Sequence, residues 1–335
     1  MTAMLTTTDL SKTFSLQQGA LARAGLRLGR SLGLDLSAQA PQQVYAVNRV
    51  SLQVARGEVL GLVGESGCGK STVGRMVAGL LPATSGALTL QGRDITRPSV
   101  ATHLQVQMVF QNPYASLNPR HRIGQAISEA AVYHGKVAAP DAPAFAAGLL
   151  RQVGLDPSYA ARYPHQFSGG QRQRIAIARA LSLDPALVVC DEAVSALDVS
   201  VQAQVLNLFM DLRESQGLTY LFISHNLAVV EYIADRVAIM YLGRIVELGD
   251  TASIFARAQH PYTQALIADA PRLDTRVAEH RPIQGELPSP LNPPGGCAFH
   301  PRCPHAMARC ASELPPLREG APGHWSACHL IHPEA

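Results

Sequence analysis

Residues 58–72 read Glu58-Val59-Leu60-Gly61-Leu62-Val63-Gly64-Glu65-Ser66-Gly67-Cys68-Gly69-Lys70-Ser71-Thr72. An apolar run typical of a strand leads into the pattern G-x-x-x-x-G-K-[ST] over residues 64–71, and a helical pattern covers 70–81. A glycine-rich loop in that position turns its N–H groups toward a phosphate, and the start of the helix adds positive potential. The stretch therefore predicts a phosphate-binding loop between a strand and a helix.

Each position of this loop is a candidate contact for a bound nucleotide. Lys70 is predicted to reach the β- and γ-phosphates, and the Ser71 hydroxyl to hold Mg²⁺. The other predicted contacts in the loop are Gly64, Glu65, Ser66, Gly67, Cys68, Gly69 and Thr72.

A second apolar strand, 187–190, delivers Asp191 and Glu192 at its carboxyl end. Ligands of open α/β sheets bind at that end of the strands, so both acids can face the same phosphates. Asp191 is predicted to bind Mg²⁺ directly or through water. Glu192 is predicted to accept a proton from the attacking water as a general base. Together with the phosphate loop, these acids predict a nucleotide hydrolase.

Three further elements extend this site. Gln111 follows a predicted strand at 106–110 and can contact both Mg²⁺ and water. The run Ser168-Gly169-Gly170-Gln171 opens a helix and predicts a second anion site at its N-terminus. His225 ends a strand at 219–224 and can hydrogen-bond a γ-phosphate.

Strands alternate with helices around these motifs, which predicts a mostly parallel α/β sheet. The predicted strands are 58–63, 87–90, 106–110, 186–191, 219–224, 236–241 and 244–249, and the predicted helices include 70–81, 200–216 and 227–234. A mostly helical block at 121–183 interrupts the alternation as an inserted subdomain. From Pro271 onward the periodicity fades, and 12 of the 23 prolines lie in 271–335.

Composition narrows the class of protein. The 335 residues are 47% hydrophobic and 16% charged with a net charge of +3, which is too apolar for a disordered chain and too weakly basic for bulk capture of nucleic acid. No run approaches ~18 apolar residues, and the N-terminus lacks the order of a signal peptide. The composition predicts a globular chain in the cytosol, of about two domains.

The order of these motifs resembles that of ATP-binding-cassette (ABC) ATPases. It looks most similar to the ATP-binding subunits of oligopeptide and dipeptide permeases, especially the F-type subunits of dipeptide permeases. The runs that carry the likeness are Val109–Tyr114, Ser116–Arg120, Tyr163–His165, Ser195–Asp198, Met240–Arg244, His260–Thr263 and Gly285–Pro294. Departures are Ala193, where the family usually has Pro, and Asn226, where Asp is usual.

The resemblance implies an architecture and a set of partners. The expected fold is an ABC-type nucleotide-binding domain over 1–270, with a phosphate-loop core, an antiparallel β subdomain and a helical subdomain inserted at about 112–185. A loop-rich extension with cysteines is expected over 271–335. The implied partners are a second ABC ATPase, expected to be a paralogue, two transmembrane permease subunits, and indirectly an extracytoplasmic peptide-binding protein. The chain is then peripheral, on the cytoplasmic face of the inner membrane.

The resemblance also assigns roles to residues. In the implied head-to-tail dimer, the Ser168–Gln171 signature contacts ATP held by the partner, and Asp198 belongs to the D-loop. Phe14 matches the aromatic that stacks on adenine, with Tyr45 as the alternative because the insert at 15–43 loosens the alignment. That insert is predicted as a surface loop or a basic amphipathic helix.

Cysteines cluster near the end of the chain at Cys297, Cys303, Cys310 and Cys328. A reducing compartment disfavours disulfides, so the spacing predicts metal ligands but leaves zinc, iron–sulfur and free thiols open. The resemblance favours a [4Fe–4S] cluster, with zinc as the alternative. Histidines that could replace a cysteine as zinc ligands are His300, His305, His324 and His329.

Together the sequence and the resemblance predict an ATP-hydrolysing motor of a bacterial peptide importer, with ATP and Mg²⁺ as cofactors. The alternative is a non-transport ABC ATPase that acts in DNA repair or on ribosomes. The cargo stays open among dipeptides, longer peptides, nickel chelates and other small solutes, and the resemblance leans to dipeptides. The choice between an identical and a paralogous ATPase partner also stays open.

Overall fold

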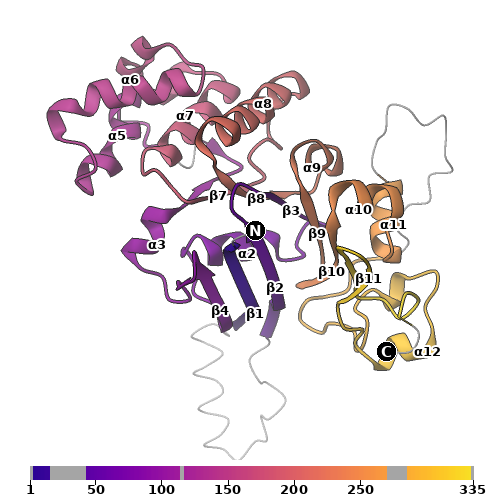
Figure 1. Cartoon of the computed structure of the whole chain (residues 1–335). Helices are drawn as coiled ribbons and strands as arrows, with labels where there is room; N and C mark the ends of the chain where they lie inside the picture. Colours follow the sequence, from indigo (N-terminus) through magenta and orange to yellow (C-terminus); the bar gives the residue numbers. More distant parts are fainter. Residues whose placement is uncertain (1–2, 16–42, 114–116, 270–284, 333–335) are drawn as a thin grey trace, which may run out of the picture.

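A computed structural model describes residues 3–15, 43–113, 117–269 and 285–332. Its main element is an eight-stranded sheet of order β11-β12-β10-β9-β3-β8-β7-β6 (Figure 1). The strands are β3 (Val59–Val63), β6 (Val106–Val109), β7 (Leu187–Asp191), β8 (Thr219–Ser224), β9 (Arg236–Tyr241), β10 (Arg244–Asp250), β11 (Arg318–Ala321) and β12 (His324–Ser326). Strands β9, β3, β8, β7 and β6 are parallel to one another, as the alternation predicts.

Strand β3 shows why the core strands are apolar along their whole length. Its side chains alternate between the two faces of the sheet. Val59 and Val63 belong to the core on one face, and Leu60 and Leu62 to the core on the other. Parallel sheets are covered on both faces, so neither set is exposed to water.

An antiparallel sheet covers one face. Its strands are β1 (Ala3–Ser15), β2 (Gln43–Ala55), β4 (Ser85–Leu90) and β5 (Arg93–Asp94), in the order β2-β1-β4-β5. Helix α2 (Lys70–Val77) packs into the same core through Val73, Met76 and Val77. Helix α3 (Val100–Gln105) precedes β6. The predicted antiparallel β subdomain is therefore present.

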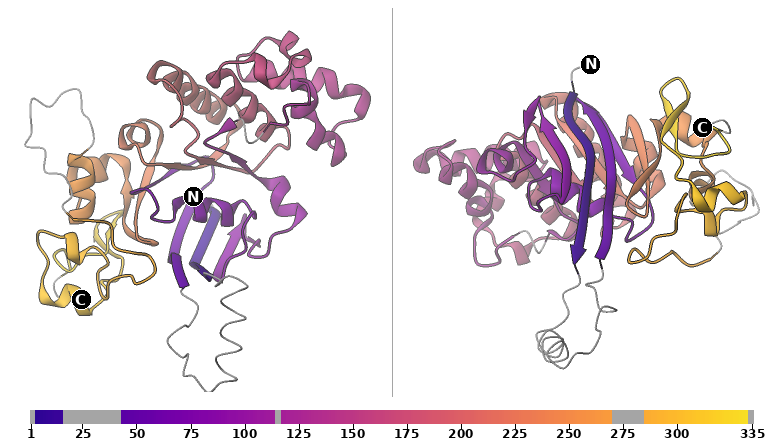
Figure 2. Two further views of the ribbon diagram at one scale, coloured as in Figure 1. Left: turned by 180° about the vertical axis from the view of Figure 1, so that it is seen from behind. Right: turned by 90° about the horizontal axis from the view of Figure 1, so that it is seen from below.

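Helices gather beyond the β6 edge, as expected for the inserted block. They are α5 (Ile123–Tyr133), α6 (Ala142–Gln152) and α7 (Gly169–Leu181), with short 3₁₀ turns at Ala139–Asp141, Pro157–Ala161 and Pro164–Gln166. Two more, α8 (Val199–Gln216) and α9 (Leu227–Ile233), connect the later core strands. Figure 2 shows the antiparallel sheet between this helical lobe and the C-terminal lobe. No helix of the described ranges is long and apolar enough to cross a bilayer.

The C-terminal segment is less irregular than its composition suggests. It follows α10 (Thr251–Arg257) and α11 (Pro261–Ala268), and contains α12 (Ala308–Ser312), a 3₁₀ turn at His300–Arg302 and the strands β11 and β12. Strand β12 pairs antiparallel with β10 and so extends the main sheet. These strands have only four and three residues, too few for a periodic signal in the sequence.

Two expectations fall outside the described residues. One is the form of the insert, of which residues 16–42 are not described, and the other is the domain boundary at 271. The boundary stays a prediction.

A pair of helical glycines tests the packing. A Cβ at Gly74 in α2 would lie 2.6 Å from Ile223 Cδ1, whereas a Cβ at Gly148 in α6 meets nothing within 4 Å. We expect Gly74→Ala to lower the free energy of unfolding by about 1–3 kcal/mol through overpacking. Gly148→Ala should raise it by about 0.5–1 kcal/mol through helix propensity. Urea denaturation of the full chain measures both, and equal effects of the two changes would contradict this packing.

Candidate nucleotide-binding site

The predicted site residues lie at the carboxyl ends of neighbouring parallel strands. The phosphate loop follows β3, His225 follows β8, Asp191 ends β7, and Gln111 lies two residues after β6. Because these four strands are adjacent and parallel, their ends form one edge. The sheet therefore brings together groups from four distant parts of the sequence.

The phosphate loop is held tightly against neighbouring backbone. A Cβ at Gly64 would lie 2.1 Å from the carbonyl oxygen of Met240, and one at Gly69 2.1 Å from that of Ala46, so only glycine fits. The buried Lys70 ammonium donates to the carbonyl oxygens of Gly64 (2.7 Å) and Glu65 (2.9 Å). These bonds point its charge into the loop, where phosphate oxygens are alternative acceptors.

Ser71 and Asp191 form the predicted magnesium pair. The Ser71 hydroxyl donates to Asp191 Oδ1 at 2.7 Å, which places two oxygen ligands side by side. Hard oxygen donors of this kind suit Mg²⁺. Burial raises the pKa of Asp191 above its ordinary value, an effect that the Ser71 hydrogen bond and the nearby cations Arg75 and Lys70 oppose. This donor set fits the ion.

Glu192 and His225 make direct contact. Glu192 Oε1 lies 3.0 Å from His225 Nδ1, and the glutamate is the more buried partner. The backbone of Glu192 has a φ of 50°, in the left-handed region that non-glycine residues rarely occupy. Strained backbone of this kind concentrates at functional sites. The pair thus combines a shielded carboxylate with an imidazole at the phosphate edge.

Gln111 and Asp198 have clear local roles. Gln111 Nε2 donates to Ser195 Oγ at 3.1 Å, which links the strand end before the helical lobe to the segment after Glu192. Asp198 lies at the N-cap of α8, where its carbonyl oxygen accepts from Gln202 N at 2.8 Å. The contact of Ser195 with Gln111 was not predicted.

The signature segment forms the start of α7. Ser168 and Gln171 make a reciprocal capping box, in which each side chain accepts a hydrogen bond from the other's backbone N–H. Gly170 packs against α8, where an added Cβ would lie 2.2 Å from Val201 Cγ1. Ser168, Gly169 and Gln171 are exposed or half-buried. The helix therefore presents its free N–H groups and positive end to an anion outside this chain.

Both candidate aromatics lie on one pair of strands. Phe14 on β1 pairs with Val44, and Tyr45 on β2 pairs with Thr13. Tyr45 directly precedes Ala46, whose carbonyl oxygen abuts Gly69 of the phosphate loop. Tyr45 is therefore one residue away from a contact with the phosphate loop. Phe14 is offset from Tyr45 by one register step of the strand pair.

The structure adds two contacts to the loop that sequence reasoning missed. The Tyr262 hydroxyl accepts a hydrogen bond from the backbone N–H of Glu65 at 2.9 Å. Arg302 NH1 donates to Glu65 Oε2, also at 2.9 Å. Tyr262 belongs to the His260–Thr263 run that carries the family likeness, which was the only signal available for it.

The departure at position 226 is conservative in this structure. Asn226 caps α9 by accepting a hydrogen bond from Ala228 N at 3.0 Å on its Oδ1. An aspartate oxygen would make the same bond, so the change leaves the helix start intact.

The prediction of a metal centre in the C-terminal segment is wrong. Among the described residues, which include all four of these cysteines, no group of three or more His, Cys, Asp or Glu side chains could hold a metal ion. Two of the histidines proposed as zinc ligands have other partners: His324 Nε2 lies 2.7 Å from Glu247 Oε1, and His329 Nε2 lies 3.0 Å from the Glu313 carbonyl. The described residues therefore support neither an iron–sulfur cluster nor zinc.

The cysteines instead pack as thiols. All four are free and line a cavity of about 10 Å³ beside Phe299. Burial raises the pKa of Cys297 to about 11 and also raises that of Cys303 and Cys328. Thiols in apolar surroundings behave as small hydrophobic groups.

Fold and site together define an ATPase of the ATP-binding-cassette class. The chain matches the family described as "ABC transporter" over residues 47–195, and the one described as "Oligopeptide/dipeptide transporter, C-terminal region" over residues 246–310. Solved structures with similar folds include an ADP- and phosphate-bound dimer of the ATP-binding cassette MJ0796 (TM-score 0.61, 23% identity, 74% of this chain and 99% of that one). Another is cbiO1 from Clostridium perfringens (TM-score 0.62, 23% identity, 77% of this chain and 92% of that one).

Curated relatives are far more similar in sequence. A probable peptide ABC transporter ATP-binding protein, y4tS of Sinorhizobium fredii, is 53% identical over 87% of this chain and 84% of its own length. The dipeptide transport ATP-binding protein DppF of Haemophilus influenzae is 51% identical over 87% of this chain and 90% of its own. The oligopeptide transport ATP-binding protein AppF of Bacillus subtilis is 50% identical over 86% and 90%. The chain belongs to the family of ATP-binding subunits of oligopeptide and dipeptide ABC transporters, and it is an ATPase.

The position of Tyr45 generates a prediction about adenine stacking. A base stacked on an aromatic ring is worth about 1–3 kcal/mol, so its loss weakens binding roughly tenfold or more. We expect Tyr45→Ala to raise the Kd for MgATP by that amount and Phe14→Ala to change it less. Isothermal titration of the full chain compares them, and a larger effect at Phe14 would reverse the assignment.

Glu192 generates a second prediction. Without its carboxylate the attacking water loses its proton acceptor, so Glu192→Gln should trap bound ATP and slow turnover by about 10²-fold or more. The measurement is phosphate release by the assembled transporter, with Glu231→Gln on α9 as the matched exposed control. Unchanged hydrolysis in the Glu192 variant would remove it from the role of base.

Proposed function

We propose that this chain is the ATP-hydrolysing motor subunit of a bacterial peptide importer that carries dipeptides. One observation carries the proposal, namely that the phosphate loop, the Ser71–Asp191 pair and the Glu192–His225 pair share one edge of the sheet. The match of residues 246–310 to the peptide-transporter C-terminal region supports the cargo class. The relatives named for peptide and dipeptide transport support it further.

Hydrolysis follows from the side chains at that edge. Ser71, Asp191 and Gln111 would hold Mg²⁺, which would supply positive charge to offset that of the phosphates. Lys70 exchanges its bonds to the loop carbonyls for bonds to the β- and γ-phosphates. Glu192 accepts the proton of the attacking water as the bond from the γ-phosphorus to the bridging oxygen breaks. His225 orients Glu192 and contacts the γ-phosphate.

The signature segment would act on a second ATPase. Its capping box fixes the exposed start of α7, where backbone N–H groups can donate to an anion. A head-to-tail dimer with a paralogous subunit would place Ser168–Gln171 against the partner's ATP. Each site is then complete only when the dimer closes, so ATP biases a two-state motion.

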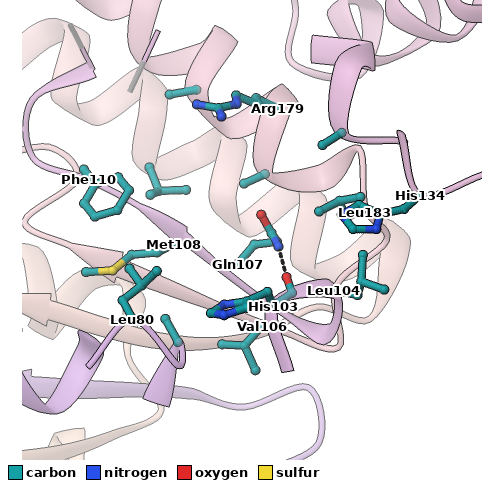
Figure 3. A pocket seen from close by; sticks show the side chains of 15 residues that line it. Leu80, His103, Leu104, Val106, Gln107, Met108, Phe110, His134, Arg179 and Leu183 are labelled. Atoms are coloured by element: carbon teal, nitrogen blue, oxygen red, sulfur yellow. Dashed lines mark hydrogen bonds between the residues drawn. The ribbon is translucent and has the colours of Figure 1, made fainter. Parts of the chain in front are cut away.

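A groove beside the helical lobe would receive the permease. Its cavity of about 270 Å³ lies where α3 and β6 meet α5 and α7, and Figure 3 shows Leu80, Met108 and Phe110 on its wall. Gln111 directly follows this wall and bonds Ser195, so the groove is connected to the phosphate edge. We assign the groove to a cytoplasmic segment of a transmembrane permease subunit. The chain is then peripheral on the cytoplasmic face of the membrane, and meets the extracytoplasmic peptide-binding protein only indirectly.

A single charged substitution tests whether the groove receives the permease. Leu80 is 51% exposed at this groove, and Leu80→Glu should reduce permease-stimulated ATP hydrolysis at least tenfold while leaving the Kd for MgATP unchanged. Leu330→Glu makes the same change in the C-terminal segment at 42% exposure and serves as the control. Full stimulation in the Leu80 variant would exclude the groove as the docking site.

The function as a whole is tested on the intact complex. Affinity purification from membranes should recover two polytopic permease subunits and a second ABC ATPase, identified by mass spectrometry. Dipeptides should stimulate ATP hydrolysis by that complex when the binding protein is present. Recovery of ribosomes or nucleic acid instead would contradict the proposal and favour a non-transport ABC ATPase.

A further inference from the structure

Glu65, the second residue of the phosphate loop, is engaged at every polar group. Its carbonyl oxygen accepts from Lys70 at 2.9 Å, and its N–H donates to the Tyr262 hydroxyl at 2.9 Å. Its carboxylate accepts from Arg302 NH1 at 2.9 Å. Two of these three partners come from the C-terminal part of the chain, 197 and 237 residues away in sequence.

The Arg302 side chain is held by several contacts. Its side chain is only 7% exposed, and its NH1 group also contacts the Tyr241 hydroxyl at 3.4 Å. Tyr241, Tyr262 and Phe299 are fully buried and pack with ring centroids 4.7–5.4 Å apart. This aromatic cluster joins the end of β9 to α11 and to the turn that carries Arg302. A charge held in such a shell keeps its position.

The same C-terminal segment reaches the other side of the loop. The Pro290 carbonyl oxygen accepts a hydrogen bond from the backbone N–H of Tyr45 at 3.2 Å. Tyr45 precedes Ala46, which abuts Gly69. The segment over 285–332 therefore contacts the phosphate loop directly through Arg302. It also bonds to strand β2, which itself abuts the loop.

An unpaired carboxylate in a phosphate loop opposes ATP, since both are anions. The Glu65 side chain is about one-fifth exposed, so water screens its charge poorly, and Arg302 supplies the neutralising charge. Arg302 also restrains a glycine-rich loop whose backbone is otherwise free to adopt many conformations. Both effects favour the form of the loop that accepts phosphates.

We propose that Arg302 is a positioning residue for ATP binding, acting through Glu65, and that this contact is a function of the C-terminal segment. The proposal requires that the chain binds ATP but does not depend on its cargo. Arg302 touches no reacting atom. Its removal should therefore weaken binding of MgATP and leave the chemical step nearly unchanged.

The test is a double-mutant cycle on the full chain, read as the Kd for MgATP by isothermal titration. We expect Arg302→Ala to raise the Kd about tenfold, and Glu65→Gln in the same chain to restore most of the loss by removing the unpaired charge. Glu65→Gln keeps a side-chain oxygen that can accept from Arg302 and removes the charge, so alone it should shift the Kd by less than Arg302→Ala does. Arg302→Lys should stay within about threefold. In the assembled transporter, the same change at Arg302 should raise KM for ATP and leave kcat within about twofold.

Controls separate this role from a merely structural one. Arg318→Ala makes the same change on the exposed edge strand β11, which three strands separate from β3, and should alter nothing. Thermal melting of each variant reports whether the chain is folded.

An unchanged Kd in a folded Arg302→Ala chain, or no recovery in the double variant, would overturn the proposal. If Arg302→Ala fails to fold, a tenfold weaker Kd in Glu65→Gln alone overturns it, because that change leaves the C-terminal segment intact. Loss of dipeptide stimulation with these binding results intact would count against the cargo and not against Arg302.

Discussion

The parallel pairing of β3, β8, β7 and β6 is the constraint on which the site depends. In this register Val63 lies opposite Ser224 and Asp191 opposite Ile223, so the residues that follow each strand emerge at the same level. A slip of one residue would turn every side chain of a strand to the other face. Since both faces carry tightly filled cores, such a slip is excluded, and the apolar strands thereby position the polar groups that follow them.

The part of the site that could be predicted from the sequence consists of residues that directly follow apolar strands. The phosphate loop, the acids after β7 and His225 each follow an apolar strand, and a parallel sheet makes strand ends coincide without any further information. The contacts of Ser195, Tyr262 and Arg302 carry no such signal because they join residues 84, 197 and 237 positions apart. Strands β11 and β12 were not predicted for a different reason, since three or four residues cannot show a period of two convincingly.

The cysteines show how a pattern can mislead when burial is unknown. A reducing compartment disfavours disulfides, but it does not by itself make clustered cysteines a metal site. Here they line a very small cavity against Phe299, where desolvation raises the pKa of Cys297, Cys303 and Cys328. The segment is held to the body by other means, through strand pairing with β10 and the buried His324–Glu247 contact. A metal is not needed to explain its order.

Unlike the buried thiols, the Arg302–Glu65 pair is charged, so its burial is costly. Removing two charges from water commonly costs as much as their attraction returns, so stability alone is a weak reason to keep such a pair. A binding loop has a further requirement, since donors that are already oriented need no reorganisation when the anion arrives. If the C-terminal contact favours the loop conformation that binds ATP, then ATP must stabilise that contact by the same free energy. We infer that the C-terminal segment and the nucleotide are thermodynamically coupled through one residue of the phosphate loop.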